Sequence, residues 1–309
     1  MTELRIGSRA SALATAQTAQ VAGRLGAHEL VTISSEGDRD RTSALDALGG
    51  AGVFVSDLRA ALLAGEVDVI VHSFKDLPTA APDGIDLVAV PKRGDARDAF
   101  CSLRARLADL PPGARVGTGS PRRRAQLLAA RPDLDVVSIR GNVDTRLGRL
   151  GAEDAERRLD GVVLALAGLE RLGRSGEATE PLDLADWPTA PAQGALAIEI
   201  RADASPDVRR RAAAIDHRPT RLATTAERGV LARLEAGCAA PVGATAVLDD
   251  GLLFLTATVY ALDGADSVTS SHAAYPEDTA RPAEELAERV AAELLERGAA
   301  ELAPVGGRA

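Results

Sequence analysis

The alternation of short apolar segments with helical segments is the feature that most constrains the fold. Over roughly the first 200 residues, apolar segments typical of strands alternate with segments typical of helices. Examples of the strand-like segments are 67–72, 115–118 and 161–166. Strands that alternate with helices form mostly parallel sheets covered by helices. The sequence therefore predicts two α/β domains in this part of the chain.

The last third of the chain has a different pattern. A long helical segment at 219–235 precedes three predicted strands within 243–275, and turn signals at Asp249–Gly251 and Asp263–Gly264 separate these strands. An amphipathic helix is expected at 281–298. This pattern predicts a small α+β domain with a three-stranded antiparallel sheet. The expected domains are 1–92 plus 195–214 (domain 1), 96–190 (domain 2) and 217–309 (domain 3).

Composition excludes several classes of function. The 309-residue chain has a net charge of −9 and only 2% aromatic residues, which disfavours a nucleic-acid binder. Its longest apolar run, about 161–169, is far shorter than the roughly 20 residues of a membrane helix. We see no signal-peptide pattern at the N-terminus, and Cys101 and Cys238 form no disulfide framework or metal motif. A reducing cytoplasm is therefore the expected compartment.

Positive charge is concentrated in one stretch. Residues 115–149 contain eight arginines and three acidic residues, a local charge of +5 that leaves −14 for the rest of the chain. An acidic protein with one strongly basic stretch indicates a local site for an anion, and a solvated arginine-rich surface is the alternative. The four histidines show no metal-ligand spacing, so no metal site is predicted.

Three motifs lie where predicted strands end. Gly117–Arg124 follows a strand and opens a helix, so it offers backbone N–H groups, the hydroxyls of Thr118 and Ser120, and arginine forks that match carboxylates. Arg140–Arg146 and Gly7–Ser11 occupy similar positions. Ligands of α/β sheets bind beyond the carboxyl ends of strands. The three motifs together predict a multi-anion site, whereas each alone is compatible with an ordinary helix cap.

Two further places could carry chemistry. Lys75 and Asp76 follow the apolar strand 67–71, and they form either a structural ion pair or a cation and a catalytic carboxylate. Cys238 lies in a loop of small residues, where a thiol could be a nucleophile, an attachment point or inert. Cys101 lies in an apolar stretch and is expected in the core, as is His72.

Taken in order, these segments resemble the porphobilinogen deaminase family, also called hydroxymethylbilane synthase, over nearly the whole chain. The segments that carry the resemblance are Ile6–Ser11, Val71–Pro78, Pro121–Arg123, Arg140–Val143, Leu166–Leu172, Gln193–Ala195 and Gly237–Cys238. The resemblance implies two periplasmic-binding-protein-like α/β domains and a third small domain that carries the cysteine.

The resemblance also implies a reaction of tetrapyrrole and heme biosynthesis. Four porphobilinogen molecules would be joined head to tail with release of ammonia, and water would free the linear product hydroxymethylbilane. A dipyrromethane cofactor attached to Cys238 would act as the primer of this transferase. The family further implies a monomer that hands its product to uroporphyrinogen-III synthase.

The resemblance assigns roles to individual residues. Asp76 would be catalytic, beside the pyrrole nitrogens. The expected cofactor- and substrate-binding residues are Arg9, Ser11, Lys75, Thr118, Ser120, Arg122, Arg123, Arg140, Arg146, Arg171 and Gln193.

One segment departs from the family pattern. The polar, glycine-rich segment 35–52 is a predicted lid, and Ala51 and Ser56 stand where the family usually has lysines. A weakly active paralogue and a non-catalytic, two-lobed anion-binding sensor are the alternatives.

Overall fold

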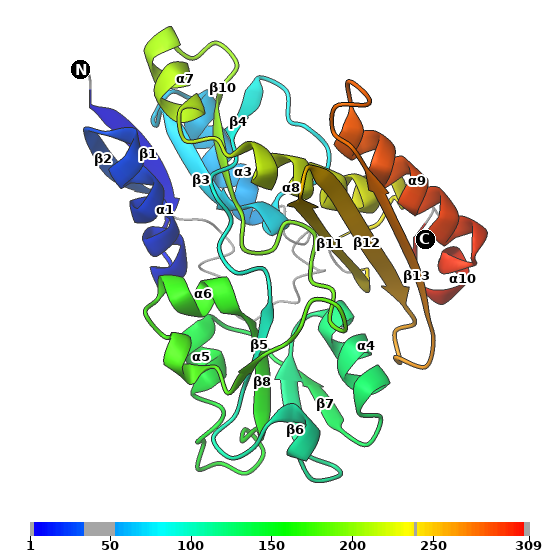
Figure 1. The fold of residues 1–309 in the computed structure, drawn as a ribbon. Helices are drawn as coiled ribbons and strands as arrows, with labels where there is room; N and C mark the ends of the chain where they lie inside the picture. The colour runs from blue at the N-terminus through cyan, green and yellow to red at the C-terminus, as the bar shows by residue number, and fades with distance from the viewer. Residues whose placement is uncertain (1–2, 34–52, 238–239, 306–309) are drawn as a thin grey trace. The chain divides into compact units, whose positions relative to one another are not determined.

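The computed structural model describes residues 3–33, 53–237 and 240–305 (Figure 1). The chain forms two compact units. Unit 1 comprises Met1–Gly94 and Gly194–Arg221, and unit 2 comprises Asp95–Gln193 and Leu222–Ala309. Among the described residues, no helix is both long enough and apolar enough to cross a membrane.

Unit 1 is built on a five-stranded sheet with the strand order β2-β1-β3-β10-β4. Its strands are β1 (Leu4–Arg9), β2 (His28–Ile33), β3 (Val69–Ser73), β4 (Ile85–Ala89) and β10 (Leu196–Arg201). β1 is parallel to β2 and β3, whereas β10 is antiparallel to β3 and β4. Its helices are α1 (Ala12–Leu25), α3 (Val53–Leu63), the 3-10 turn η2 (Phe74–Asp76) and α7 (Pro206–Ala213).

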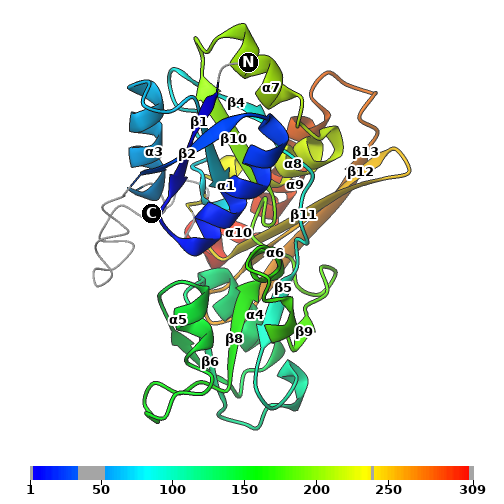
Figure 2. The ribbon, with the colours of Figure 1, turned by 90° about the vertical axis from the view of Figure 1, so that its left-hand side faces the viewer.

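Unit 2 contains a second five-stranded sheet with the corresponding order, β7-β6-β8-β5-β9. Four of its strands, β5, β6, β8 and β9, are labelled in Figure 2. Its strands are β5 (Asp98–Cys101), β6 (Arg115–Thr118), β7 (Asp135–Ser138), β8 (Gly161–Ala165) and β9 (Glu180–Pro181). β6 is parallel to β7 and β8, and β5 is antiparallel to its two neighbours. Its helices are η3 (Leu107–Asp109), α4 (Pro121–Ala130), α5 (Val143–Leu147), α6 (Leu166–Arg171) and η4 (Ser175–Glu177).

The C-terminal part of unit 2 is a three-stranded antiparallel sheet that packs on helices. Apolar side chains of the central strand, including Leu253 and Leu255, form one core with those of the flanking helices. Gly229 lets two helices approach closely, because a Cβ there would lie 2.6 Å from the Ala287 Cβ. The elements are α8 (Arg218–Arg233), β11 (Val242–Asp249), β12 (Leu252–Tyr260), β13 (Ser267–Ala274), α9 (Pro282–Glu296) and α10 (Ala299–Leu302).

The predicted fold class is confirmed. Two mostly parallel α/β sheets precede an α+β part with the three-stranded antiparallel sheet. The strands that sequence reading missed are β5, β9 and β10, and both β5 and β10 run against their neighbours. Cys101 is buried as expected, and burial raises the pKa of its thiol to about 12.

A buried ion pair ties β10 to the rest of unit 1. Glu199 of β10 accepts two hydrogen bonds from the Arg59 guanidinium of α3, at 3.0 and 2.6 Å. His72 Nε2 lies 3.2 Å from the same carboxylate. Burial alone would raise the pKa of Glu199, but His72 and Arg59 outweigh it and lower the pKa to about 2. His72 is thus a buried partner of Glu199, in line with its expected place in the core.

This depressed pKa predicts acid sensitivity. Glu199 should stabilise the folded state fully above its unfolded pKa near 4.5 and lose that contribution, on the order of 3 kcal/mol, as the pH falls toward about 2. Urea unfolding between about pH 6 and pH 2.5 should therefore show a shallower loss of stability with falling pH in Glu199→Gln than in wild type. Glu66→Gln, at an exposed position, is the control. Equal slopes in Glu199→Gln and wild type would contradict this assignment.

Candidate active site

Four of the predicted site residues lie at the carboxyl edge of the unit 1 sheet. Arg9 is the last residue of β1, and Lys75 and Asp76 form η2 directly after the parallel neighbour β3. Ser11 caps α1 by accepting a hydrogen bond from the Ala14 N–H at 3.3 Å. Parallel strands bring these four side chains to one edge, as the sequence predicted.

The turn that carries Lys75 and Asp76 is firmly anchored. Phe74 is buried in front of them, and its N–H donates to the Ala195 carbonyl at 3.0 Å. Gln17 of α1, which sequence reasoning missed, donates to the Ser73 hydroxyl at 2.9 Å. The Asp76 side chain is exposed, so this edge presents a carboxylate to solvent from a fixed support.

Hydroxyl groups line the corresponding edge of the unit 2 sheet. Ser120 caps α4 by accepting from the Arg123 N–H at 3.4 Å, and the Thr118 oxygen accepts from the Ser120 N–H at 3.2 Å. Both hydroxyls accept in these bonds, so their O–H groups remain able to donate to an anion. Gly119 permits this turn, because a Cβ there would lie 2.7 Å from the Ile139 carbonyl oxygen.

Two predicted arginines are buried around one carboxylate. Arg122 and Arg123 are 3% and 6% exposed, and they donate to the two oxygens of the fully buried Asp98, at 2.9 and 2.6 Å. Arg122 also donates to the Pro188 carbonyl at 3.0 Å, and Arg123 donates to the Val163 carbonyl at 2.8 Å. These side chains therefore contribute to the packing of unit 2, whatever else they bind.

Positive charge exceeds negative charge at this edge. Asp98 can neutralise only one of its two guanidinium partners. The Arg146 Nε–H donates to the Gly141 carbonyl at 2.8 Å, and burial together with nearby Arg123 lowers the pKa of Arg146 to about 10. A guanidinium destabilised in this way gains from a bound anion, which would restore its pKa.

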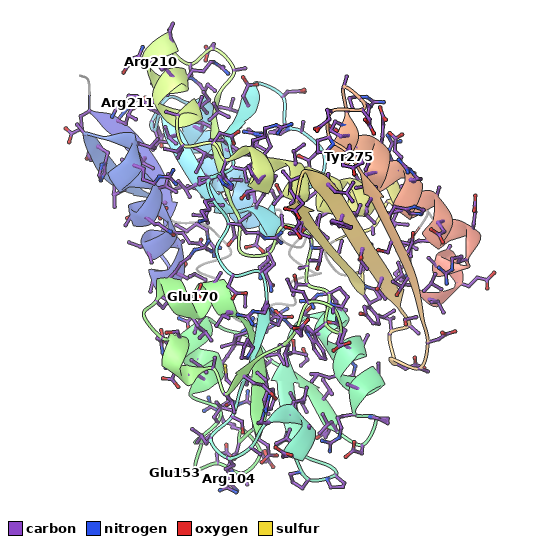
Figure 3. All side chains as sticks on the ribbon, in the orientation of Figure 1. Arg104, Glu153, Glu170, Arg210, Arg211 and Tyr275 are labelled. Carbon is purple, nitrogen blue, oxygen red and sulfur yellow. The ribbon has the colours of Figure 1, made fainter. Side chains whose placement is uncertain are left out.

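Two further predicted arginines follow strands of the same sheet. Arg140 comes after β7, and Arg171 ends α6, which follows β8. Burial lowers the pKa of Arg171, whereas neighbouring Glu170 opposes that shift. Glu170, which also lies on α6, is labelled in Figure 3. The unit 2 edge is therefore rich in arginine, as the basic stretch of the sequence predicted.

Gln193 joins the arginine cluster from the segment that leads back to unit 1. Its side-chain amide donates to Asp98 at 2.8 Å and to the Ala96 carbonyl at 2.9 Å. The preceding Ala192 has φ 63°, and its N–H donates at 2.6 Å to the buried Glu227 carboxylate of α8. Sequence reasoning missed Asp98 and Glu227, because no motif marks a buried acid whose hydrogen-bond donors lie far away along the chain.

Some predicted features lie outside the described residues. Cys238, Ala51 and the expected lid are among them, and Ser56 is exposed on α3. Within the described part of the chain, no group of three or more His, Cys, Asp or Glu side chains could hold a metal ion.

Comparison with known proteins defines the class. The family model "Porphobilinogen deaminase, dipyromethane cofactor binding domain" matches residues 4–210, and "Porphobilinogen deaminase, C-terminal domain" matches residues 221–296. The porphobilinogen deaminase of Leifsonia xyli subsp. xyli is 56% identical over 98% of this chain and 95% of its own length. That of Thermobifida fusca is 54% identical over 86% of this chain and 84% of its own length.

A solved solute-binding protein is also similar at a low level. The L-cystine solute receptor of Neisseria gonorrhoeae is 13% identical and covers 69% of this chain and 84% of that chain. Its TM-score of 0.36 is too low to support a conclusion.

These matches define a transferase of porphyrin biosynthesis with a dipyrromethane cofactor. The chain belongs to the porphobilinogen deaminase family. The predicted family, function and cofactor are thereby confirmed. The excess of buried positive charge around Arg123 and Arg146 fits a cofactor that carries carboxylates.

Proposed function

We propose that the chain catalyses the stepwise condensation of porphobilinogen with the individual residues in the roles given below. The observation that carries this proposal lies at the carboxyl edge of the unit 2 sheet, where two guanidinium groups, of Arg122 and Arg123, share the single Asp98 carboxylate and Arg146 lies near Arg123. Porphobilinogen has an acetate and a propionate side chain, so a growing pyrrole chain brings several carboxylates. Arginine forks bind carboxylates with two parallel hydrogen bonds, which positions them as well as neutralising them.

The binding residues come from both sheet edges. Buried Arg122 and Arg123 act mainly through charge, and the exposed or half-buried side chains supply direct contacts. The proposed cofactor- and substrate-binding set is Arg9, Ser11, Lys75, Thr118, Ser120, Arg122, Arg123, Arg140, Arg146, Arg171 and Gln193.

Asp76 is the proposed catalytic residue. When bound, dipyrromethane supplies the pyrrole carbon to which the next unit is joined. As the carbon–nitrogen bond of porphobilinogen breaks and ammonia leaves, positive charge develops on the substrate. The exposed Asp76 carboxylate can stabilise that charge and then accept the proton that the coupled pyrrole carbon loses. Its anchored turn supports this role, since electrostatic stabilisation requires a group that is already in place.

We further propose three working domains: residues 1–92 plus 195–214, 96–190 and 217–309. The proposed cofactor attachment point is Cys238 in the third domain. The protein would act as a cytoplasmic monomer and pass its product to uroporphyrinogen-III synthase.

Attachment at Cys238 predicts a specific mass. Intact-mass analysis of the purified protein should show an adduct of two pyrrole units that is lost in Cys238→Ser. Cys101→Ser should retain the adduct, because the Cys101 thiol is buried and its pKa is raised. An unmodified wild-type protein with full activity would refute this attachment and favour a cofactor-free enzyme.

Arg146 offers the cleanest test of carboxylate binding. Arg146→Leu should raise KM for porphobilinogen about tenfold or more, since a charge-assisted hydrogen bond contributes roughly 1.5–3 kcal/mol. Arg124→Leu is a matched control, because exposed Arg124 also donates to one backbone carbonyl, that of Val136. Steady-state kinetics and thermal melting should separate the two variants. Equal KM values in both variants would contradict the assignment of Arg146.

Asp76 is tested by removing its charge alone. Asp76→Asn should lower the single-turnover rate by about a hundredfold or more, with little change in Tm because the side chain is exposed. Asp83→Asn, at another exposed position, should leave both quantities unchanged. Near-normal chemistry with a lowered Tm in Asp76→Asn would instead support a structural ion pair in this turn.

A further inference from the structure

The two five-stranded sheets can be compared strand by strand, because their orders correspond. Each contains one reversed strand, β10 in unit 1 and β5 in unit 2. The first residue of each reversed strand lies opposite the last residue of an antiparallel neighbour, β3 or β8: Leu196 lies opposite Ser73, and Asp98 lies opposite Ala165. Asp98 and Leu196 therefore hold equivalent positions at the carboxyl edges of the two sheets.

The helices that follow β1 and β6, which are α1 and α4, correspond in the same way. Ser11 and Ser120 are both N-caps, and each accepts a hydrogen bond from the N–H three residues later. The second and third helical residues are Leu13 and Ala14 in α1, and they are Arg122 and Arg123 in α4. Unit 1 thus has apolar residues at all three positions where unit 2 has the Asp98–Arg122–Arg123 cluster.

The comparison with unit 1 shows that a sheet of this order does not need an acid at the position of Asp98. A sheet of this order forms in unit 1 without a carboxylate at the first position of its reversed strand. The carboxylate is therefore not a requirement of the sheet order, and the acid and the two arginines occur together in one half only. Burying three charged groups is costly, so an apolar set would be the simpler way to fill the space.

The contacts of Asp98 define what it can do. One oxygen accepts from Arg123 and from Gln193 at 2.6 and 2.8 Å, and the other accepts from Arg122 and the Trp187 indole at 2.9 and 3.0 Å. The bonds to Asp98 orient the two guanidinium groups and the Gln193 amide, and the Trp187 indole adds a fourth bond to the carboxylate. The cluster keeps a net positive charge, because one carboxylate faces two cations.

We propose that Asp98 is a positioning residue for substrate and cofactor binding. It holds Arg122, Arg123 and Gln193 in one arrangement, so that the remaining positive charge is presented to pyrrole carboxylates without rearrangement on binding. This proposal rests on the proposed function of the arginine edge. It adds a residue that touches neither cofactor nor substrate, and that acts through the arginines.

The test compares two ways of disturbing the same carboxylate. Asp98→Asn removes its charge, and Trp187→Phe removes one hydrogen bond to it with no change of charge. Each purified variant is assayed for Tm, for the pyrrole adduct by intact mass, and for kcat and KM with porphobilinogen well below its Tm. Trp187 is the only tryptophan of the chain, so its fluorescence reports the state of the cluster in Asp98→Asn and wild type.

A positioning role predicts a specific pattern. Folded Asp98→Asn should show an adduct content reduced about tenfold or a KM raised about tenfold, whereas Trp187→Phe should lower Tm and keep both near wild type. If Asp98→Asn does not fold, Asp98→Glu keeps the charge but moves the oxygens by about a methylene, and it should still raise KM. A folded Asp98→Asn, or failing that an Asp98→Glu, with wild-type adduct and KM would overturn the proposal.

Failure of the proposed function and failure of the positioning role of Asp98 would give different results. If wild type itself lacks an adduct, attachment at Cys238 fails while the KM comparison still tests Asp98. If Arg146→Leu leaves KM unchanged but Asp98→Asn raises it, the arginine assignment fails at Arg146 and the positioning role of Asp98 stands.

Discussion

Each five-stranded sheet has a buried carboxylate on its reversed strand, and the need to compensate that charge constrains how the neighbouring helix packs. Glu199 on β10 and Asp98 on β5 are both buried, and an unpaired charge at a buried position would be strongly destabilising. Each is stabilised by guanidinium donors from a helix: Arg59 of α3 for Glu199, and Arg122 and Arg123 of α4 for Asp98. These ion pairs therefore fix the helices relative to the sheets. In unit 2, the helix held in this way, α4, carries candidate site residues at the carboxyl edge of the sheet.

The two ion pairs differ in charge balance, and that difference separates packing from binding. Glu199 lies in the middle of β10, away from the carboxyl edge of the sheet, and it faces one guanidinium group and one histidine. Asp98 faces two guanidiniums at the edge itself, with Arg146 close enough to Arg123 to have its pKa lowered. The first arrangement is complete without a ligand. The second retains positive charge at the place where ligands of α/β sheets bind.

Most of the fold could be predicted from the sequence because its helices and parallel strands carry strong local signals. The strand Arg115–Thr118 has the predicted bounds, and the helix Pro121–Ala130 begins within the Gly117–Arg124 motif, as predicted, since a cap and a proline mark its start. β5 has only four residues, and β10 follows a glycine-containing segment, so the local signal for both strands is weak. The side-chain pattern of a strand also does not show whether it runs parallel or antiparallel to its neighbours. Their direction is set by long-range pairing, which one segment of sequence cannot reveal.

The same limit explains which site residues could be predicted. Arg122, Arg123 and Gln193 lie in recognisable motifs, so the sequence indicates them directly. Their shared partner Asp98 is 24 to 95 residues away along the chain, on a strand that was not predicted. Burial of the arginines likewise depends on tertiary packing, and an arginine-rich motif alone equally predicts a solvated surface.

The two units share one sheet topology but present different chemical groups at their carboxyl edges. The edge of unit 1 presents a lysine and an exposed carboxylate on an anchored turn, groups suited to charge development and proton transfer. The edge of unit 2 has buried arginines locked by a carboxylate, which suits the binding of many anionic side chains. Each condensation step repeats the same chemistry, so one catalytic group is enough for all steps. The product chain grows at each step, so the anion-binding residues must bind the carboxylates of several pyrrole units. In the function that we propose, one framework used twice would meet both requirements, with apolar residues at Leu13 and Leu196 in one half and charges at Arg122 and Asp98 in the other.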